Sequence, residues 1–161
     1  AARGYADRVV SVDLSAPALH AAERNMAHNR QFSAVAAARH ETIAADAFEV
    51  LARMHVQRES FDVVILDPPM FAQNQGQITS ALAAYRKLTH LGLGVLRPGG
   101  ILVQASCSSR VEADLFYNAI HQAARDANRQ LRELERSGHA LDHPIRFKEG
   151  AYLKCLFAEA F

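Results

Sequence analysis

The sequence predicts an α/β fold in which helices cover a largely parallel β-sheet. Short runs of β-branched or apolar residues alternate with segments of helical periodicity along the 161 residues, a pattern typical of strand–helix–strand units. Three expected strands end on an acid, at Asp13, Asp46 and Asp67, and a fourth runs into the Ser-Cys-Ser segment at residues 106–108. Because ligands bind beyond the carboxyl ends of the strands in such sheets, we expect a functional site at this edge.

The first two expected strands are residues 9–12 and 42–45, which are short and contain several β-branched residues. Ser15 can cap the helix after the first strand, because the next apolar residues keep helical spacing, namely Leu19, Ala22 and Met26. Asp46 and Glu49 form a capping signature, so a second helix should follow at once, with one face made of Phe48, Leu51 and His55.

The third expected strand covers residues 61–66 and stops at Asp67 and two prolines. A helix that runs toward Leu96 should follow, because helical spacing resumes in Ile78, Leu82, Tyr85 and Thr89. The Arg-Pro-Gly-Gly turn at residues 97–100 should separate this helix from a strand at residues 101–105.

The last third of the chain begins with a second capping signature, Ser109 and Glu112, before a helix that carries Phe116, Ile120 and Ala123. A weak strand is expected at residues 131–135, then a loop through Pro144 and Gly150, and finally a strand at residues 152–157.

Composition limits the classes of function. Half of the residues are hydrophobic and 22% are charged, as in a globular protein, and the length fits one domain. A net charge of +1 gives no global basic field, so a nucleic-acid site must be local. The two cysteines lack CxxC spacing, which argues against a disulfide framework and a zinc site and suits a reducing cytoplasm. We expect no metal and no membrane span.

The segment FDVVILDPPMFA, at residues 61–72, is the most informative motif. Two prolines after a strand are ordinary strand stops, but they do not account for Asp67 or Phe71. One acid at a strand end is usually a helix cap, and Asp46 fits that role well. An acid at the end of the second strand of such a fold, however, suits ribose hydroxyls, because a carboxylate accepts two hydrogen bonds from a diol.

Five segments together resemble class I S-adenosylmethionine-dependent methyltransferases: VVSVDLSAPALHAAERNMAHN, AADAFEVL, FDVVILDPPMFA, LRPGGILVQASCSS and DHPIRFKEGAYLKCLF. More narrowly, they resemble the catalytic domain of the bacterial 23S ribosomal RNA cytosine-C5 methyltransferases. Asp-Pro-Pro-x-Phe together with the Ser-Cys-Ser strand end and the Tyr-Leu-Lys-Cys tail is more specific than Asp-Pro-Pro alone. The resemblance implies a Rossmann-like sheet with flanking helices, with S-adenosylmethionine as cofactor and 23S rRNA as partner.

The resemblance also implies roles for the strand-end residues. Asp13, with Leu14, would hold the cofactor ribose, and Asp46 with Ala47 would lie along the adenine. Asp67, which would also contact the cofactor, would form with Pro68 and Pro69 the wall between methyl donor and target base. Phe71 would offer an extruded base an aromatic surface, the alternative being packing against the next helix.

Cys107 is the expected nucleophile in the methylation of cytosine at carbon five. Carbon five of cytosine needs activation, and addition of a thiolate at carbon six supplies it. The helix expected at Ser109 would favour a negative charge on Cys107, whereas the alternative role is that of a small buried hydrophobe. Asp67 would recognise or protonate the pyrimidine edge. Cys155 is expected to be a core residue, while His143 and Lys154 match family positions without an assigned role.

In the family, a first strand and a glycine-rich loop precede the segment that begins at Ala1. We therefore expect residues 1–161 to be one methyltransferase domain truncated at its N-terminus. Loss of a central strand would leave two strand edges that pair with each other or support self-association. Alternative functions are methylation of uracil C5 or of a guanine, or an inactive RNA-binding or scaffold remnant.

Overall fold

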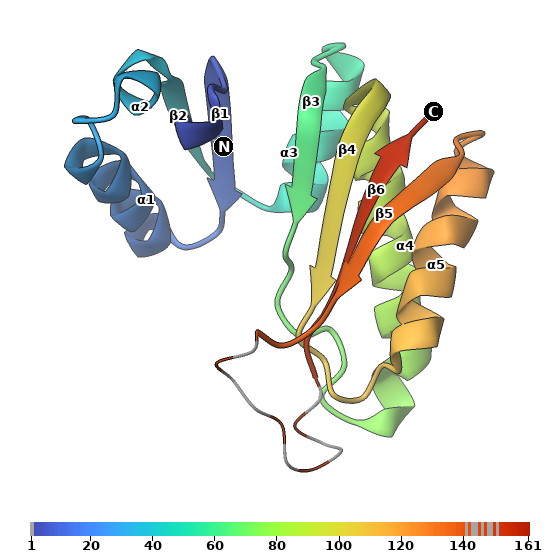
Figure 1. Cartoon of the computed structure of the whole chain (residues 1–161). Coiled ribbons are helices and arrows are strands. Elements are labelled where there is room, and N and C mark those ends of the chain that lie inside the picture. Colours follow the sequence, from blue (N-terminus) through green and yellow to red (C-terminus); the bar gives the residue numbers. More distant parts are fainter. Residues whose placement is uncertain (1, 141, 143–144, 146, 148–149, 151) are drawn as a thin grey trace. The chain divides into compact units, whose positions relative to one another are not determined.

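A computed structural model describes residues 2–140, 142, 145, 147, 150 and 152–161 (Figure 1). The chain divides into two compact units, Ala1–Arg53 and Met54–Phe161. Both units combine parallel strands with helices, so the expected α/β class is confirmed.

The first unit contains a two-stranded parallel sheet. Strand β1 (Arg8–Asp13) pairs with β2 (Arg39–Ala44) in continuous register. The helices are η1 (Ala2–Gly4), α1 (Ala16–His28), α2 (Ser33–Ala37) and α3 (Ala47–Val56), the last of which continues into the second unit. The expected cap of α1 is confirmed, because the Ser15 hydroxyl accepts a hydrogen bond from Ala18 N at 3.3 Å.

The second unit contains a four-stranded mixed sheet in the order β3-β4-β6-β5. Its strands are β3 (Phe61–Leu66), β4 (Leu96–Ser106), β5 (Leu131–Ser137) and β6 (Lys154–Ala160). Strands β3 and β4 are parallel, whereas β6 runs antiparallel to both β4 and β5. The short helix η2 (Gln75–Gln77) leads into α4 (Ile78–Gly94), and α5 (Ala113–Asp126) follows β4.

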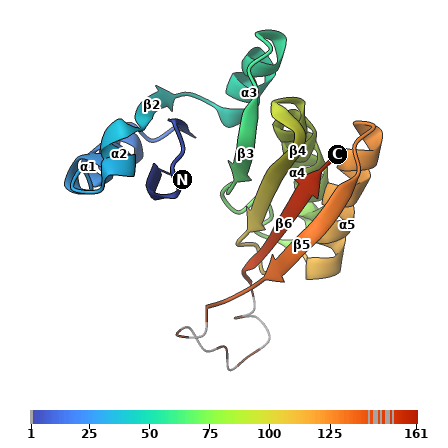
Figure 2. The same cartoon turned by 45° about the horizontal axis from the view of Figure 1, so that its top comes forward.

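Helices α4 and α5 pack side by side against one face of this sheet (Figures 1 and 2). Their contact with the sheet forms the core of the unit. Its largest fully buried side chains include Tyr85, Leu102, Phe116, Ile120 and Leu156. Burial of this apolar surface is the main source of stability for such a layered unit.

The structure corrects several expected element boundaries, among them those of the strand expected at residues 42–45, which is Arg39–Ala44. The Arg-Pro-Gly-Gly segment lies within β4. Its four residues form a bulge opposite a single residue of β3, Asp62, between the pairs Phe61–Leu96 and Val63–Ile101. Gly99 has φ of 73°, which favours glycine at this irregularity. Helix α5 has Glu112 as its N-cap without a side-chain hydrogen bond, so the expected cap at Ser109 is wrong.

The last strand starts and ends later than expected, at Lys154 and Ala160, because its ends follow the antiparallel pairing with β4. Pro144 of the expected loop and His143 lie outside the described residues.

The expected pairing between the strands that end at Asp13 and Asp67 stays a prediction, because the two strands belong to separate units. Strand β1 belongs to the two-stranded sheet and β3 forms an edge of the four-stranded sheet. Self-association through these edges remains a prediction. Among the described residues, no helix combines the length and the apolar character needed to cross a membrane.

Candidate active site

The carboxyl ends of β1 and β2 carry the two acids expected at a cofactor. Because the strands are parallel and Asp13 pairs with Ala44, Asp13 and Asp46 lie at the same end of this sheet. Asp13 is exposed, and its Oδ1 accepts a hydrogen bond from Ser15 N at 2.7 Å. The Oδ1 atom of Asp46 accepts hydrogen bonds from Phe48 N at 2.7 Å and Glu49 N at 3.3 Å. Asp46 is therefore the cap of α3, as its sequence context indicated.

These residues suit a nucleoside in different ways. The exposed carboxylate of Asp13 is an acceptor for a ribose diol, and the neighbouring Leu14 side chain, 75% exposed, offers an apolar surface. Asp46 already uses one oxygen for the helix cap, and the half-buried Ala47 is the first residue of α3. The acceptor carboxylate of Asp13 and the apolar side chain of Leu14 fit the adenosine part of S-adenosylmethionine, and the cofactor roles of these residues and of Asp67 remain predictions.

The carboxyl ends of β3 and β4 bring the second group of expected residues together. The two strands are parallel and Leu66 pairs with Gln104, so Asp67 and Cys107 follow neighbouring strand ends. Asp67 is exposed, and Cys107 is a free, half-buried thiol. Pro68 is half-buried and Pro69 is exposed. An acid, two rigid proline residues and a thiol therefore share one edge of this sheet.

Phe71 packs against the helix that follows it. Its ring centroid lies 5.0 Å from that of Tyr85 on α4, and the Phe71 side chain is half-buried. Tyr85 in turn contacts Phe116 of α5 at 5.1 Å. The geometry favours the packing alternative for Phe71, and its role toward a base stays a prediction.

A buried polar network fixes the segment around Cys107. The Tyr85 hydroxyl and Ser106 Oγ are 2.8 Å apart, and Ser108 N donates to the same Oγ at 3.3 Å. Ser108 Oγ donates to Ala72 O at 3.3 Å, in the loop that carries the Asp-Pro-Pro motif. Because Ser106 and Ser108 are almost fully buried, these bonds are shielded from water. They hold Cys107 in place relative to the loop after β3.

The expected helix dipole at Cys107 is wrong, and the structure instead places a buried lysine side chain against the segment that carries Cys107. Helix α5 begins only at Ala113, and a helix dipole acts mainly within the first turn. Instead, Lys154 of β6 is 6% exposed, and its Nζ donates to Ser108 O at 2.6 Å and to Tyr152 O at 3.2 Å. Burial lowers the pKa of Lys154, while the charge of Cys107 raises it. The ammonium is therefore bonded to the residue that directly follows Cys107.

Cys155 lies closer to the candidate site than its apolar context indicated. It pairs with Ala105 on β4, beside the end of β3 that carries Asp67. Burial raises the pKa of the Cys155 thiol, and the negative charge of Asp67 raises it further. Both effects favour the neutral thiol, so Cys155 is not suited to act as a thiolate.

Lys154 is the functional candidate that sequence reasoning left without a role. The signal was present in the alternation of β6, where Lys154 occupies the same buried register as Leu156, Ala158 and Ala160. A lysine in a buried register of a strand needs polar partners. Those partners, Ser108 O and Tyr152 O, are visible only in the folded chain.

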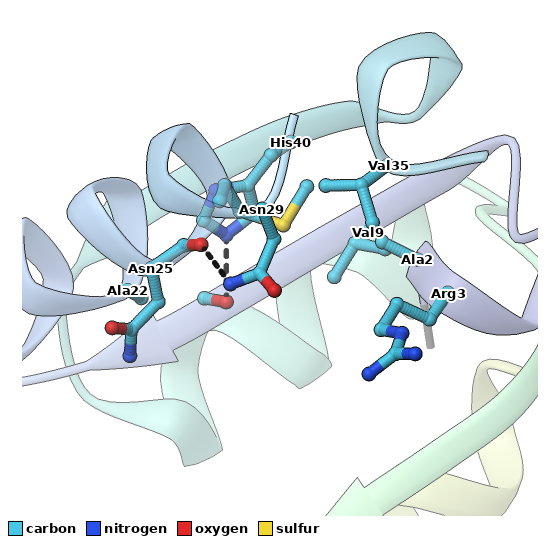
Figure 3. Close-up of a pocket in the computed structure, with 10 residues that line it drawn as sticks. Ala2, Arg3, Val9, Ala22, Asn25, Asn29, Val35 and His40 are labelled. Carbon is cyan, nitrogen blue, oxygen red and sulfur yellow. Dashed lines mark hydrogen bonds between the residues drawn. The ribbon is translucent and has the colours of Figure 1, made fainter. Parts of the chain in front are cut away.

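The first unit also has a cavity of about 380 Å³ that none of the expected site residues lines (Figure 3). Within it, Ser11 Oγ lies 3.0 Å from His40 Nε2, and Asn29 Nδ2 donates to Asn25 O at 2.8 Å. Among the described residues, no cluster of three or more His, Cys, Asp or Glu could hold a metal ion.

The layered sheet and its strand-end residues define a Rossmann-like methyltransferase fold. The chain is similar in structure to SMU.776, described as a methyltransferase candidate and complexed with S-adenosylhomocysteine. The TM-score is 0.73 at 21% identity, covering 93% of this chain and 38% of that one. The chain belongs to the family described as Conserved hypothetical protein 95, which matches residues 1–103.

Two relatives are named for ribosomal RNA methylation. The chain is 46% identical over 159 residues to a ribosomal RNA large subunit methyltransferase of Deinococcus radiodurans, covering 99% of this chain. It is 40% identical over 156 residues to ribosomal RNA large subunit methyltransferase I of Photobacterium profundum, covering 96% of this chain. The chain spans 38% of the length of each of these relatives.

Proposed function

We propose that this chain forms part of the catalytic domain of an S-adenosylmethionine-dependent methyltransferase that produces 5-methylcytosine in large-subunit ribosomal RNA. The names of the relatives support the RNA substrate, and the S-adenosylhomocysteine in a structure of similar fold supports the cofactor. One observation carries the cytosine chemistry: a free thiol, Cys107, follows a strand end that neighbours the one before Asp67, and the buried ammonium of Lys154 bonds the next residue, Ser108.

In this proposal the first unit binds the cofactor, which supplies an electrophilic methyl group. The exposed carboxylate of Asp13 accepts hydrogen bonds from the ribose hydroxyls, and Leu14 covers an apolar face of the nucleoside. Asp46 orients the start of α3, where Ala47 lies along the adenine.

The second unit holds and activates the target base. The Cys107 thiolate forms a bond with carbon six of cytosine, and the electron pair of the C5–C6 double bond moves toward carbon five, which takes the methyl group. Loss of the carbon-five proton to a base then restores the double bond, and the thiolate leaves with the electron pair of the S–C bond. Pro68 and Pro69 form a rigid wall beside the base, and Phe71 supports that wall through its contact with Tyr85.

Asp67 favours cytosine over uracil as the substrate. Its exposed carboxylate can accept a hydrogen bond from the amino group of cytosine, whereas uracil presents a carbonyl oxygen at the same position. A guanine methyltransferase would have no need of the Cys107 thiol. The chemistry of these two side chains therefore supports cytosine C5.

Trapping with fluorinated RNA tests this proposal in the whole protein. We expect RNA containing 5-fluorocytosine to form a covalent complex that persists on a denaturing gel, because fluorine cannot leave as a proton. Cys107→Ser should abolish the complex while leaving cofactor affinity nearly unchanged. Cys155→Ser is the matched control and should still form it. A covalent band that survives Cys107→Ser would exclude Cys107 as the nucleophile, and methylation of guanine alone would exclude the cytosine reaction.

A further inference from the structure

Lys154 is a buried cation whose polar partners are main-chain carbonyl groups. Its side chain is 6% exposed, and Nζ donates to Ser108 O and Tyr152 O. Within the described residues, no carboxylate forms an ion pair with it. A buried ammonium without a carboxylate is costly, which indicates that another negative group uses its charge.

The segment that Lys154 contacts carries the Cys107 thiol. Strand β6 pairs Lys154 with Ser106, the residue before Cys107, and the Lys154 ammonium bonds the carbonyl of Ser108, the residue after it. The cation is thus anchored on both sides of the cysteine. The hydroxyl of Tyr85 on α4 bonds Ser106, the residue before Cys107, but burial raises the pKa of this hydroxyl, which stays neutral. The charge of Asp67, which follows β3, raises the pKa of the other thiol, that of Cys155.

We propose that Lys154 is a positioning residue that generates and holds the thiolate form of Cys107. This inference rests on the proposed function and names the group that activates its nucleophile. The carbonyls of Ser108 and Tyr152 accept two N–H bonds of the ammonium at 2.6 and 3.2 Å, which holds its charge close to the residue that precedes Ser108.

The proton transfer leaves an ion pair beside the target base. The S–H bond of Cys107 breaks, its proton passes to water, and the thiolate that results is stabilised by the Lys154 ammonium. Attraction between these charges is strong in a partly buried setting, and a neighbouring lysine is one of the features that favour thiolates in proteins. When the thiolate later leaves carbon six of the base, the Lys154 ammonium again stabilises its negative charge.

Alkylation of Cys107 tests this role without RNA or cofactor. Iodoacetamide reacts with the thiolate, so its rate with Cys107 in the whole protein can be followed by peptide mass spectrometry from about pH 5 to about pH 10. Lys154→Met removes the charge and keeps an apolar stem, and Lys154→Gln keeps N–H donors without the charge. We expect both variants to lower the rate at pH 7 at least about tenfold, a change of one logarithmic unit in thiolate population, and to recover at high pH.

Lys87→Met is the matched control, because Lys87 is an exposed lysine on α4, and it should leave the rate unchanged. Circular dichroism identifies variants that retain their fold. Rates within about twofold of the wild type in either folded Lys154 variant would overturn the proposal. In the unsubstituted protein, Cys107 should react much faster than Cys155 at pH 7, and equal rates would also overturn it, whether or not the variants fold.

The two proposals can fail separately in these experiments. Slower alkylation in the Lys154 variants of a protein that forms no 5-methylcytosine would support the thiolate pair and reject the reaction. Trapping by fluorinated RNA with unchanged alkylation would support the reaction and reject the role of Lys154. Under both proposals, Lys154→Gln should lower kcat and leave the KM for the cofactor unchanged.

Discussion

The two units of the chain bury their strands to very different extents. In the second unit, β6 and residues 100–106 of β4 alternate between buried and half-buried residues, and Leu102, Leu156 and Ala158 have no exposed surface. In the first unit, every residue of β1 and β2 is half-buried or exposed. Four strands with two packed helices thus bury strand residues fully, whereas the fully buried apolar residues of the first unit lie on its helices.

The difference shows where stability lies relative to the candidate site. Parallel strands are normally covered on both faces, and the valines of β1 are only half-buried within this chain. In the second unit, the candidate nucleophile follows a strand of a well-packed sheet. In the first unit, the candidate cofactor residues follow strands of a sheet that buries little apolar surface. We therefore expect substitutions in the second unit to cost more stability than matched substitutions in the first.

The largest contrast should come from two phenylalanines. Phe116 is fully buried between the rings of Tyr85 and Tyr117, so Phe116→Ala should lower the free energy of unfolding by about 3–5 kcal/mol. Phe32 of the first unit is 37% exposed under the guanidinium of Arg3, and Phe32→Ala should cost less than about 1 kcal/mol. Urea unfolding measures both, and equal losses would contradict the comparison.

Two arginines provide a smaller contrast. Arg129 donates to the carbonyl oxygens of Leu93, Leu96, Arg97, Ala160 and Phe161 at 3.0–3.2 Å. Arg129→Met should lower the free energy of unfolding by about 2–3 kcal/mol, because several carbonyls lose a charged donor. Arg8 of the first unit pairs with Glu41 at 2.9 Å, with about a third of each side chain exposed. Arg8→Met should cost less than about 1 kcal/mol, so a larger loss at Arg8 than at Arg129 would reverse the expected order.

The smallest effect should be the pH-dependent contribution of two glutamates to the free energy of unfolding. Hydrogen bonds from Arg136 and His121 lower the pKa of Glu133 to about 2. A carboxyl group with a lowered pKa stabilises the fold above its unfolded pKa of roughly 4.3, and this contribution is lost as the pH falls toward 2. Glu133→Gln should therefore reduce stability at pH 7 by less than about 1 kcal/mol, since the pair is partly exposed.

The matched variant in the first unit is Glu41→Gln. The hydrogen bond from Arg8 lowers the pKa of Glu41, but this carboxylate lies in a less buried setting and should contribute less. Thermal unfolding between pH 7 and about pH 3 measures both variants. A difference between Glu133→Gln and the wild type that grows as the pH falls would show that the sign of the linkage is wrong.

Local chemistry was enough to predict several elements from the sequence. Strand β3 was found to the residue, at Phe61–Leu66, because its apolar run ends at an acid and two prolines that cannot extend it. The starts of α1 and α3 followed from Ser15 and Asp46, whose side chains bond amides two or three residues away. The placement of Asp67 and Cys107 at neighbouring strand ends followed from the parallel order of the strands.

Tertiary structure decided the features that depend on distant partners. The sequence of residues 97–100 is typical of a turn, but these residues belong to β4 because the strand pairs with β3 on both sides of them. Ser109 and Glu112 have the local pattern of a capping box that starts at Ser109, but the folded chain begins the helix after Glu112. Lys154 reaches the Cys107 segment because β6 pairs antiparallel with β4. That pairing joins strands far apart in the chain, so no local pattern could reveal that a lysine near the C-terminus lies beside the candidate nucleophile.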